Sequence, residues 1–182
     1  AFYKKILFPK ASKDIWSSTE TTLPAGTSKQ DFDKDSVLSR FDYQLKSSGI
    51  DTNHTLSPDF SWSPSDIFQI KNYYQLDKYI LIFPFCSPHL TSKKWPYYNE
   101  LISMINEKSD NKLKVVIAPG PGEIEESSKI NALCILDNGN ALDISQLAAL
   151  IKDSLFVVAN DTGPAHMTAH LGSKGIALFG SH

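Results

Sequence analysis

From residue 76 onward, short apolar runs alternate with longer segments in which apolar residues recur every three or four positions. The short runs are apolar throughout and bounded by turn residues, which is typical of strands buried on both faces of a sheet. The longer segments have the spacing of helices that pack one face on a core. The predicted strands are 79–84, 113–118, 133–136, 155–159 and 176–179, and the predicted helices are 96–108, 123–130, 144–152 and 164–171. This alternation predicts an α/β fold with a parallel, doubly wound, Rossmann-like sheet.

The first part of the chain has a different pattern. Residues 2–9 predict a strand, and residues 10–30, rich in Ser, Thr, Lys, Pro and Gly, predict a long surface loop. Helical spacing returns at 35–46, whereas 50–64 has no clear period. Because this part has few strands for its length, it resembles the end of a domain. The predicted division is 1–66 as the carboxy-terminal part of an incomplete domain, 67–75 as a linker and 76–182 as a second domain, incomplete at its carboxyl end.

Composition and charge narrow the possible functions. The chain is 41% hydrophobic and 21% charged, as is usual for a soluble globular protein. Its formal net charge of -2 gives no reason to expect a broad nucleic-acid surface or a nucleic-acid partner. No apolar run approaches the roughly 20 residues that span a bilayer. Cys86 and Cys134 lie in apolar settings, which predicts two buried thiols in a reducing compartment.

The passage from strand 155–159 into the following helix is the clearest candidate for a ligand site. The segment Asp161-Thr162-Gly163-Pro164 can open a helix, because a side-chain oxygen can cap its free amides and Pro164 suits the first helical position. At the carboxyl end of a parallel strand, exposed helix amides favour an anion such as phosphate. Capping alone accounts for Thr162, whereas the carboxylate of Asp161 favours a sugar hydroxyl or a metal.

Two further loops follow strands of the same sheet, and the right-handed crossover rule predicts that all three emerge at one edge. Residues 85–96 contain hydroxyls and two lysines that can hold a phosphate, although a solvated loop anchored by Trp95 is the alternative. In 119–123, glycines allow close backbone approach and Glu123 could accept hydrogen bonds from a ribose. The alternative is a turn in which Glu123 is only a helix-start charge. Together the three loops predict a nucleotide site.

His166 and His170 are four residues apart on one helix face, as two zinc ligands would be. No glutamate lies between them in the required place, and the sequence offers no third ligand. We therefore predict no metal site, and a His166 that is packed or lies near a phosphate.

Four passages resemble glycosyltransferase family 9, the lipopolysaccharide heptosyltransferases and their relatives. They are Ile82-Phe83-Pro84 through Lys93-Lys94-Trp95-Pro96, Gly120-Pro121-Gly122-Glu123, Asn160-Asp161-Thr162-Gly163-Pro164-Ala165-His166, and Ala177-Leu178-Phe179-Gly180. Their order and spacing match as well, over residues 76–182, with a weaker likeness over 35–64. The resemblance implies a GT-B fold of two Rossmann-like domains, in which 76–182 binds the nucleotide-sugar donor and 1–66 is the tail of the acceptor-side domain.

The resemblance also implies a reaction. This is an inverting, metal-independent transfer of a sugar, commonly heptose from ADP-heptose, to the lipid A–core acceptor of lipopolysaccharide. The donor is a substrate, and the resemblance implies no cofactor. It places the reaction at the cytoplasmic face of the inner membrane, with peripheral contact between the protein and that membrane. Lys93 would stabilise the diphosphate of the leaving ADP. The residues implied in substrate binding are Ser87, Thr91, Ser92, Lys93, Gly122, Glu123, Asp161, Thr162, Gly163 and His166.

Two departures from the family pattern change these expectations. The family usually has Pro-Gly after the first strand, whereas Pro84 is followed here by Phe85, a bulky side chain where the backbone would approach the ligand. The family's amino-terminal Gly-Asp turn and proposed general-base aspartate have no counterpart in this chain, so we expect the chain alone to be inactive. Two alternatives remain: a non-catalytic nucleotide-binding module, and an α/β domain whose turn is merely capped. No residue predicts the nucleotide base or the oligomeric state.

Overall fold

The structure is a computed structural model that describes residues 26, 28, 34–47, 50, 53, 56–57 and 59–180. The chain divides into two compact units, residues 1–58 and 59–182. In the first unit, helix α3 (Val37–Ser47) confirms the helix predicted over 35–46. An ion pair between Lys46 and Asp42, one turn apart, supports this helix. The strand predicted at 2–9 and most of the loop predicted at 10–30 lie outside the described residues.

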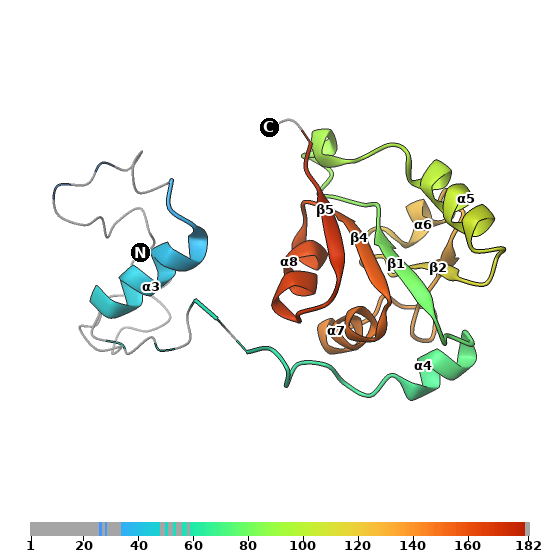
Figure 1. The fold of residues 1–182 in the computed structure, drawn as a ribbon, viewed down its shortest axis with the longest axis horizontal. Helices are drawn as coiled ribbons and strands as arrows, with labels where there is room; N and C mark the ends of the chain where they lie inside the picture. Colours follow the sequence, from blue (N-terminus) through green and yellow to red (C-terminus); the bar gives the residue numbers. More distant parts are fainter. Residues whose placement is uncertain are drawn as a thin grey trace. The chain divides into compact units, whose positions relative to one another are not determined.

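The second unit is built around a five-stranded sheet in the order β3-β2-β1-β4-β5 (Figure 1). The strands are β1 (Tyr79–Phe83), β2 (Lys114–Ile117), β3 (Leu133–Cys134), β4 (Phe156–Asn160) and β5 (Gly175–Leu178). Each neighbouring pair is parallel. In the central register, Ile82 of β1 lies opposite Ile117 of β2 and Val158 of β4. Each strand overlaps a predicted one, so the predicted parallel sheet is confirmed.

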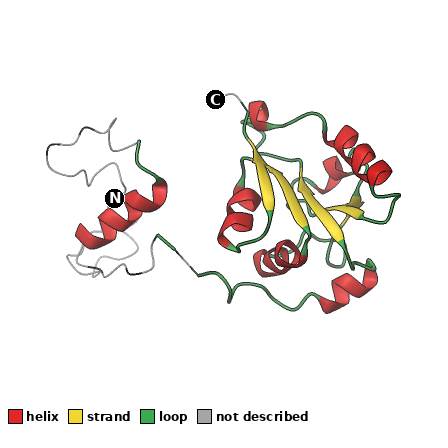
Figure 2. Cartoon of the chain, viewed as in Figure 1, coloured by secondary structure: helices red, strands yellow, loops and turns green. Residues whose placement is uncertain are grey.

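Helices cover both faces of this sheet (Figure 2). They are α4 (Phe68–Tyr73), α5 (Tyr98–Lys108), α6 (Ile124–Ser127), α7 (Ile144–Asp153) and α8 (Gly163–His170), with a short 3-10 turn η1 (Thr91–Lys93). One core cluster joins Leu81 and Val157 of the sheet to residues of α4 and α7 and to partly buried Met167 of α8. The other joins Ile82 and Val158 to α5. Successive strand residues therefore face opposite cores, which explains the continuous apolar runs.

The segment 67–75, predicted as a linker, belongs to the second unit. It contains α4, and its residues Ile67 and Ile70 are buried in the core. Helix α4 ends in a Schellman motif, in which the N–H of Leu76 donates to the carbonyl of Lys71 (2.8 Å) and Gln75 has a φ of 52°. The division of the chain lies between residues 58 and 59. The assignment of the two parts to acceptor and donor sides stays a prediction.

Two smaller expectations differ from the structure. Helix α6 ends at Ser127, well before residue 130, because the following residues close tighter turns, such as the bond from the Ile130 N–H to the Ser127 carbonyl (3.0 Å). Cys86 and Cys134 are free thiols, but both are half-buried rather than fully buried. The Cys86 thiol donates to the carbonyl of Leu90 (3.3 Å). Among the described helices, none is long and apolar enough to cross a membrane.

Candidate functional site

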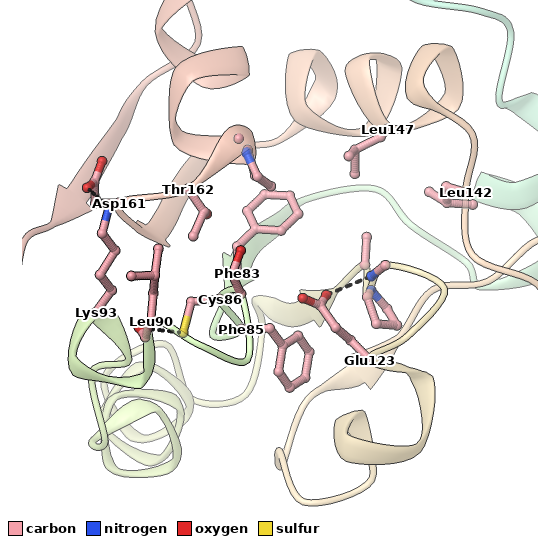
Figure 3. Close-up of a pocket in the computed structure, with 16 residues that line it drawn as sticks. Phe83, Phe85, Cys86, Leu90, Lys93, Glu123, Leu142, Leu147, Asp161 and Thr162 are labelled. Atoms are coloured by element: carbon pink, nitrogen blue, oxygen red, sulfur yellow. Dashed lines mark hydrogen bonds and ion pairs between the residues drawn. The ribbon is translucent and has the colours of Figure 1, made fainter.

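A pocket of about 480 Å³ lies at the carboxyl ends of β1, β2 and β4 (Figure 3). Its walls come from the three loops that follow these strands and from two leucines, Leu142 before α7 and Leu147 within it. This confirms that the three loops meet at one edge of the sheet. The edge is where open parallel sheets bind ligands, so the pocket is the candidate site.

One end of the pocket is charged. The ammonium group of Lys93, at the end of η1, lies 2.6 Å from the Oδ2 atom of Asp161, which follows β4. Their side chains are only 20% and 15% exposed. Figure 3 shows this pair beside Thr162, at the start of α8. The loops after β1 and β4 therefore bring together a cation and a carboxylate from distant parts of the sequence.

The start of α8 faces the same end of the pocket. Thr162, Gly163 and Pro164 line it, and Pro164 stands in the first turn of the helix as predicted. The expectation that a side chain caps this helix is wrong: within the described residues α8 has no side-chain cap, and the Thr162 hydroxyl instead donates to the Asn160 carbonyl (3.2 Å). The first backbone amides of a helix favour an anionic ligand.

The loop after β2 is held by its own glutamate. An oxygen of the Glu123 carboxylate accepts a hydrogen bond from the Gly120 N–H (2.8 Å), and the Glu123 N–H donates to the Gly120 carbonyl (2.9 Å). These two bonds close the turn, which supports the structural alternative for Glu123. The side chain nevertheless lines the pocket, so the turn presents part of a carboxylate to a ligand.

The other end of the pocket is apolar. Leu142 and Leu147 lie there, at the side away from the ion pair (Figure 3), and Phe83, Ala118 and Pro119 also line the pocket. A pocket with a cation and a helix start at one end and apolar side chains at the other can bind a molecule that is itself anionic at one end and flat and apolar at the other.

The sequence model of glycosyltransferase family 9 (heptosyltransferase) matches residues 24–182. The chain belongs to glycosyltransferase family 9. A comparison with curated proteins gives no significant match.

Solved structures of this family have the same fold. E. coli heptosyltransferase WaaC with ADP-2-deoxy-2-fluoro heptose is 20% identical, with a TM-score of 0.55, over 79% of this chain and 45% of that one. The family 9 glycosyl transferase from Veillonella parvula is 17% identical, with a TM-score of 0.55, and the match covers 76% of this chain and 42% of that one. The chain thus spans less than half the length of either structure. This likeness confirms the predicted fold class, an α/β fold of the GT-B type with a Rossmann-like parallel sheet.

The residues assigned by the family 9 resemblance fall into two groups. Those that line the pocket are Ser87, Lys93, Glu123, Asp161, Thr162 and Gly163. Those outside its lining are Thr91, Ser92, Gly122 and His166. Thr91 and Ser92 are exposed on η1, and the His166 side chain is 73% exposed, with Nε2 4.0 Å from the Asp161 carboxylate. Whether any of these residues binds a substrate stays a prediction.

Phe85, the departure from the family 9 pattern, forms part of the pocket wall. Its side chain is buried and, in Figure 3, lies between the loop of Cys86 and the loop of Glu123. The ammonium group of Lys94 lies 5.7 Å from the centre of its ring, within the range of a cation–π contact, and is also paired with Glu126. The bulky side chain is therefore accommodated between two loops.

Sequence reasoning missed several residues of the site. Leu142 and Leu147 were assigned to no loop of the site, because they approach the pocket from the α7 side. Asn160 was named only as part of a motif and given no role, although it is fully buried and its side chain makes hydrogen bonds to the loop after β1. A polar residue at the end of an otherwise apolar strand was the available signal, since buried amides need partners.

The two histidines of α8 are not part of a group of three potential metal ligands in the described part of the chain. The ring of His170 packs against Phe60, with 5.3 Å between ring centres. Among the described residues, no three His, Cys, Asp or Glu side chains are grouped to hold a metal ion.

Proposed function

We propose that this chain is the donor-binding part of an inverting glycosyltransferase that transfers heptose from ADP-heptose to a lipopolysaccharide core acceptor. The observation that carries the proposal is the polarity of the pocket. Lys93 and the start of α8 occupy one end, and Leu142 and Leu147 occupy the other. A nucleotide sugar has the same polarity, because its diphosphate is anionic and its base is flat and largely apolar.

The proposed fit assigns one part of the donor to each end. The diphosphate would lie at the α8 amides and at Lys93, where it would compete with Asp161 for the ammonium group. The base would lie between the loop after β2 and the leucines near α7. Solved structures of E. coli WaaC contain ADP or ADP-2-deoxy-2-fluoro heptose, which supports an adenine nucleotide as the first ligand to test.

The proposed reaction is a displacement at the anomeric carbon. An acceptor hydroxyl attacks that carbon, a base takes the hydroxyl proton, the bond from carbon to the diphosphate oxygen breaks, and ADP leaves with the electron pair. Lys93 and the α8 start would neutralise the charge that develops on the diphosphate, without a metal ion. No base is assigned in this chain, so we propose donor binding without transfer by this chain alone. The proposed setting is the cytoplasmic face of the inner membrane.

Calorimetric titration of ADP, with GDP and UDP for comparison, tests the proposal. We expect saturable binding of ADP by the wild-type chain and roughly tenfold weaker binding by Lys93→Ala, which corresponds to about 1.4 kcal/mol. Lys71→Ala is the matched control, because Lys71 is also ion-paired, to Asp153 at 2.7 Å, but does not line this pocket. A folded chain that binds no nucleotide would leave only the alternative of an α/β domain in which the turn before α8 is structural.

A further inference from the structure

Lys93 lies on a turn that has little support of its own. The 3-10 turn η1 spans only Thr91–Lys93, and within the described residues it has no side-chain cap and no buried residue. Thr91 and Ser92 are exposed. Short 3-10 segments are weakly stabilised by their own hydrogen bonds. Contacts from outside η1 must therefore hold Lys93 opposite Asp161.

The side chain of Asn160 supplies one such contact. Its Oδ1 atom accepts a hydrogen bond from the Trp95 N–H (3.2 Å) and lies 3.1 Å from the Tyr98 hydroxyl. Its Nδ2 atom donates to the carbonyls of Pro84 (3.0 Å) and Phe85 (3.4 Å). The carboxamide thereby uses both of its donors, and its oxygen accepts from Trp95 and lies within reach of the Tyr98 hydroxyl, which also lies 3.2 Å from the Phe83 carbonyl. It ties the end of β4 to both ends of the loop that carries η1.

The backbone at Gly180 supplies the second contact. A Cβ atom placed on Gly180 would lie 2.4 Å from the Ser92 carbonyl oxygen and 3.3 Å from the Lys93 Cα atom. The chain after β5 thus passes so close to η1 that only glycine fits. In Figure 1 the end of β5 lies beside this turn.

We infer that Asn160 and Gly180 are positioning residues that hold η1 so that the Lys93 ammonium group faces Asp161 and the pocket. Neither residue lines the pocket, so each would act through Lys93 rather than by contact with a ligand. Asn160 acts on both partners of the ion pair, because Asp161 follows it directly and Trp95 is two residues after Lys93. The consequence for nucleotide binding rests on the proposed function, whereas the placement of Lys93 does not.

The first test follows Lys93 without any ligand. The folded chain is treated with an acylating reagent, and the labelling rate of each lysine is measured by peptide mass spectrometry. In Gly180→Ala, we expect Lys93 to be labelled roughly threefold faster or more, because η1 is displaced and opens more often. Lys71, paired with Asp153, is the internal reference and should keep its rate.

Two more variants complete this test. Phe179→Ala is the matched control, because Phe179 precedes Gly180 and its side chain is 71% exposed, so we expect Lys93 to keep its labelling rate there. Asn160→Asp keeps the size of the side chain but replaces the Nδ2 donor, so Lys93 labelling should rise there too. Because Asn160 is fully buried, the labelling of Asn160→Asp is interpreted only if this variant is folded. The labelling of Gly180→Ala decides whether the inference holds. An unchanged Lys93 rate in folded Gly180→Ala overturns the inference.

The second test measures ADP affinity. We expect Gly180→Ala to bind ADP roughly tenfold more weakly, and the double variant Lys93→Ala/Gly180→Ala to bind no more weakly than Lys93→Ala alone, since coupled residues are not additive. Additive losses would overturn a role through Lys93. If the wild-type chain binds no ADP while the labelling result is as expected, the proposed function fails and the positioning of Lys93 stands.

Discussion

The ammonium group of Lys93 lies 2.6 Å from the carboxylate of Asp161, although the two residues are 68 positions apart in the sequence. The pair is mostly buried, so water screens it less than an exposed pair, whose net contribution is about 0–1 kcal/mol. In the structure, Asp161 is paired with Lys93, the residue that we propose to bind the diphosphate. A nucleotide must therefore compete with a carboxylate for Lys93.

The first prediction is that Asp161→Asn binds ADP more tightly than the wild-type chain. The amide keeps the shape of the side chain but removes a negative charge beside the diphosphate and frees the charge of Lys93. We expect a gain of roughly fivefold, or about 1 kcal/mol, by calorimetry. Asp153→Asn is the control, because that carboxylate pairs with Lys71 outside the pocket. Weaker binding by Asp161→Asn would mean that the carboxylate is needed to orient Lys93.

The sheet was predictable from the sequence because its strands are buried on both faces. A run such as 79–83 is apolar throughout, and no competing pattern obscures it. The helices α5 and α7 were equally clear from their spacing. Parallel strands in turn predict that loops after β1, β2 and β4 meet at one edge, and the pocket confirms this.

Helix α4 was not predicted because its end carries no glycine. Gln75 takes the left-handed conformation at the position where glycine is the usual signal. The helix is also only six residues long, too short for a clear period. Its stability comes from Ile67 and Ile70 in the core, which is a tertiary contact that local sequence does not reveal.

The side chains that line the site were only partly predictable, because their orientation also depends on tertiary contacts. The sequence indicated which loops carry hydroxyls and charges, but not which of these side chains turn inward. Lys93 lines the pocket whereas Thr91 and Ser92, on the same turn, do not. That orientation depends on Asn160 and Gly180, which are 67 or more positions from Lys93 along the chain. The sequence can indicate that a buried amide such as Asn160 needs partners, but not which loop supplies them.

The second prediction concerns the turn after β2. Glu123→Ala removes the acceptor of the Gly120 N–H bond, and we expect the free energy of unfolding to fall by about 1 kcal/mol. Glu123→Gln retains an acceptor oxygen and should stay within about 0.5 kcal/mol of the wild-type value. Urea unfolding measures both. Equal losses in the two variants would show that the charge of the side chain, rather than this bond, stabilises the turn.

The third prediction concerns the start of α7, the helix that contributes Leu147 to the pocket. Asp143 and Gln146 form a capping box, with the Asp143 carboxylate accepting from the Gln146 N–H (2.8 Å) and the Gln146 side chain accepting from the Asp143 N–H (3.0 Å). Asp143→Ala should destabilise the chain by about 1 kcal/mol, whereas Asp143→Asn, which can still cap, should lose only a few tenths. Thermal unfolding of both variants tests this. Equal stability of Asp143→Ala and the wild-type chain would contradict the role of the cap.

The fourth prediction is a loss of stability at alkaline pH, caused by two buried tyrosines. The Tyr79 hydroxyl donates to the Leu150 carbonyl (2.7 Å), and the hydroxyl of buried Tyr98 lies 3.2 Å from the Phe83 carbonyl and 3.1 Å from the Asn160 Oδ1 atom. Burial raises the pKa of Tyr79 above its ordinary value of 10.0, with a further contribution from the charge of Asp153. Burial also raises the pKa of Tyr98.

The direction of the pH effect follows from proton binding in the two states. Above about pH 10 the unfolded chain releases these protons while the folded chain keeps them, so stability is full below that pH and falls as the pH rises. Each tyrosine contributes a slope of up to about 1.4 kcal/mol per pH unit. Tyr79→Phe should lose about 1 kcal/mol at neutral pH, because the Leu150 carbonyl loses its donor, and should show a shallower alkaline slope. Urea unfolding at several pH values measures both quantities. Equal alkaline slopes in Tyr79→Phe and the wild-type chain would mean that Tyr79 releases its proton at the same pH in the folded and the unfolded chain.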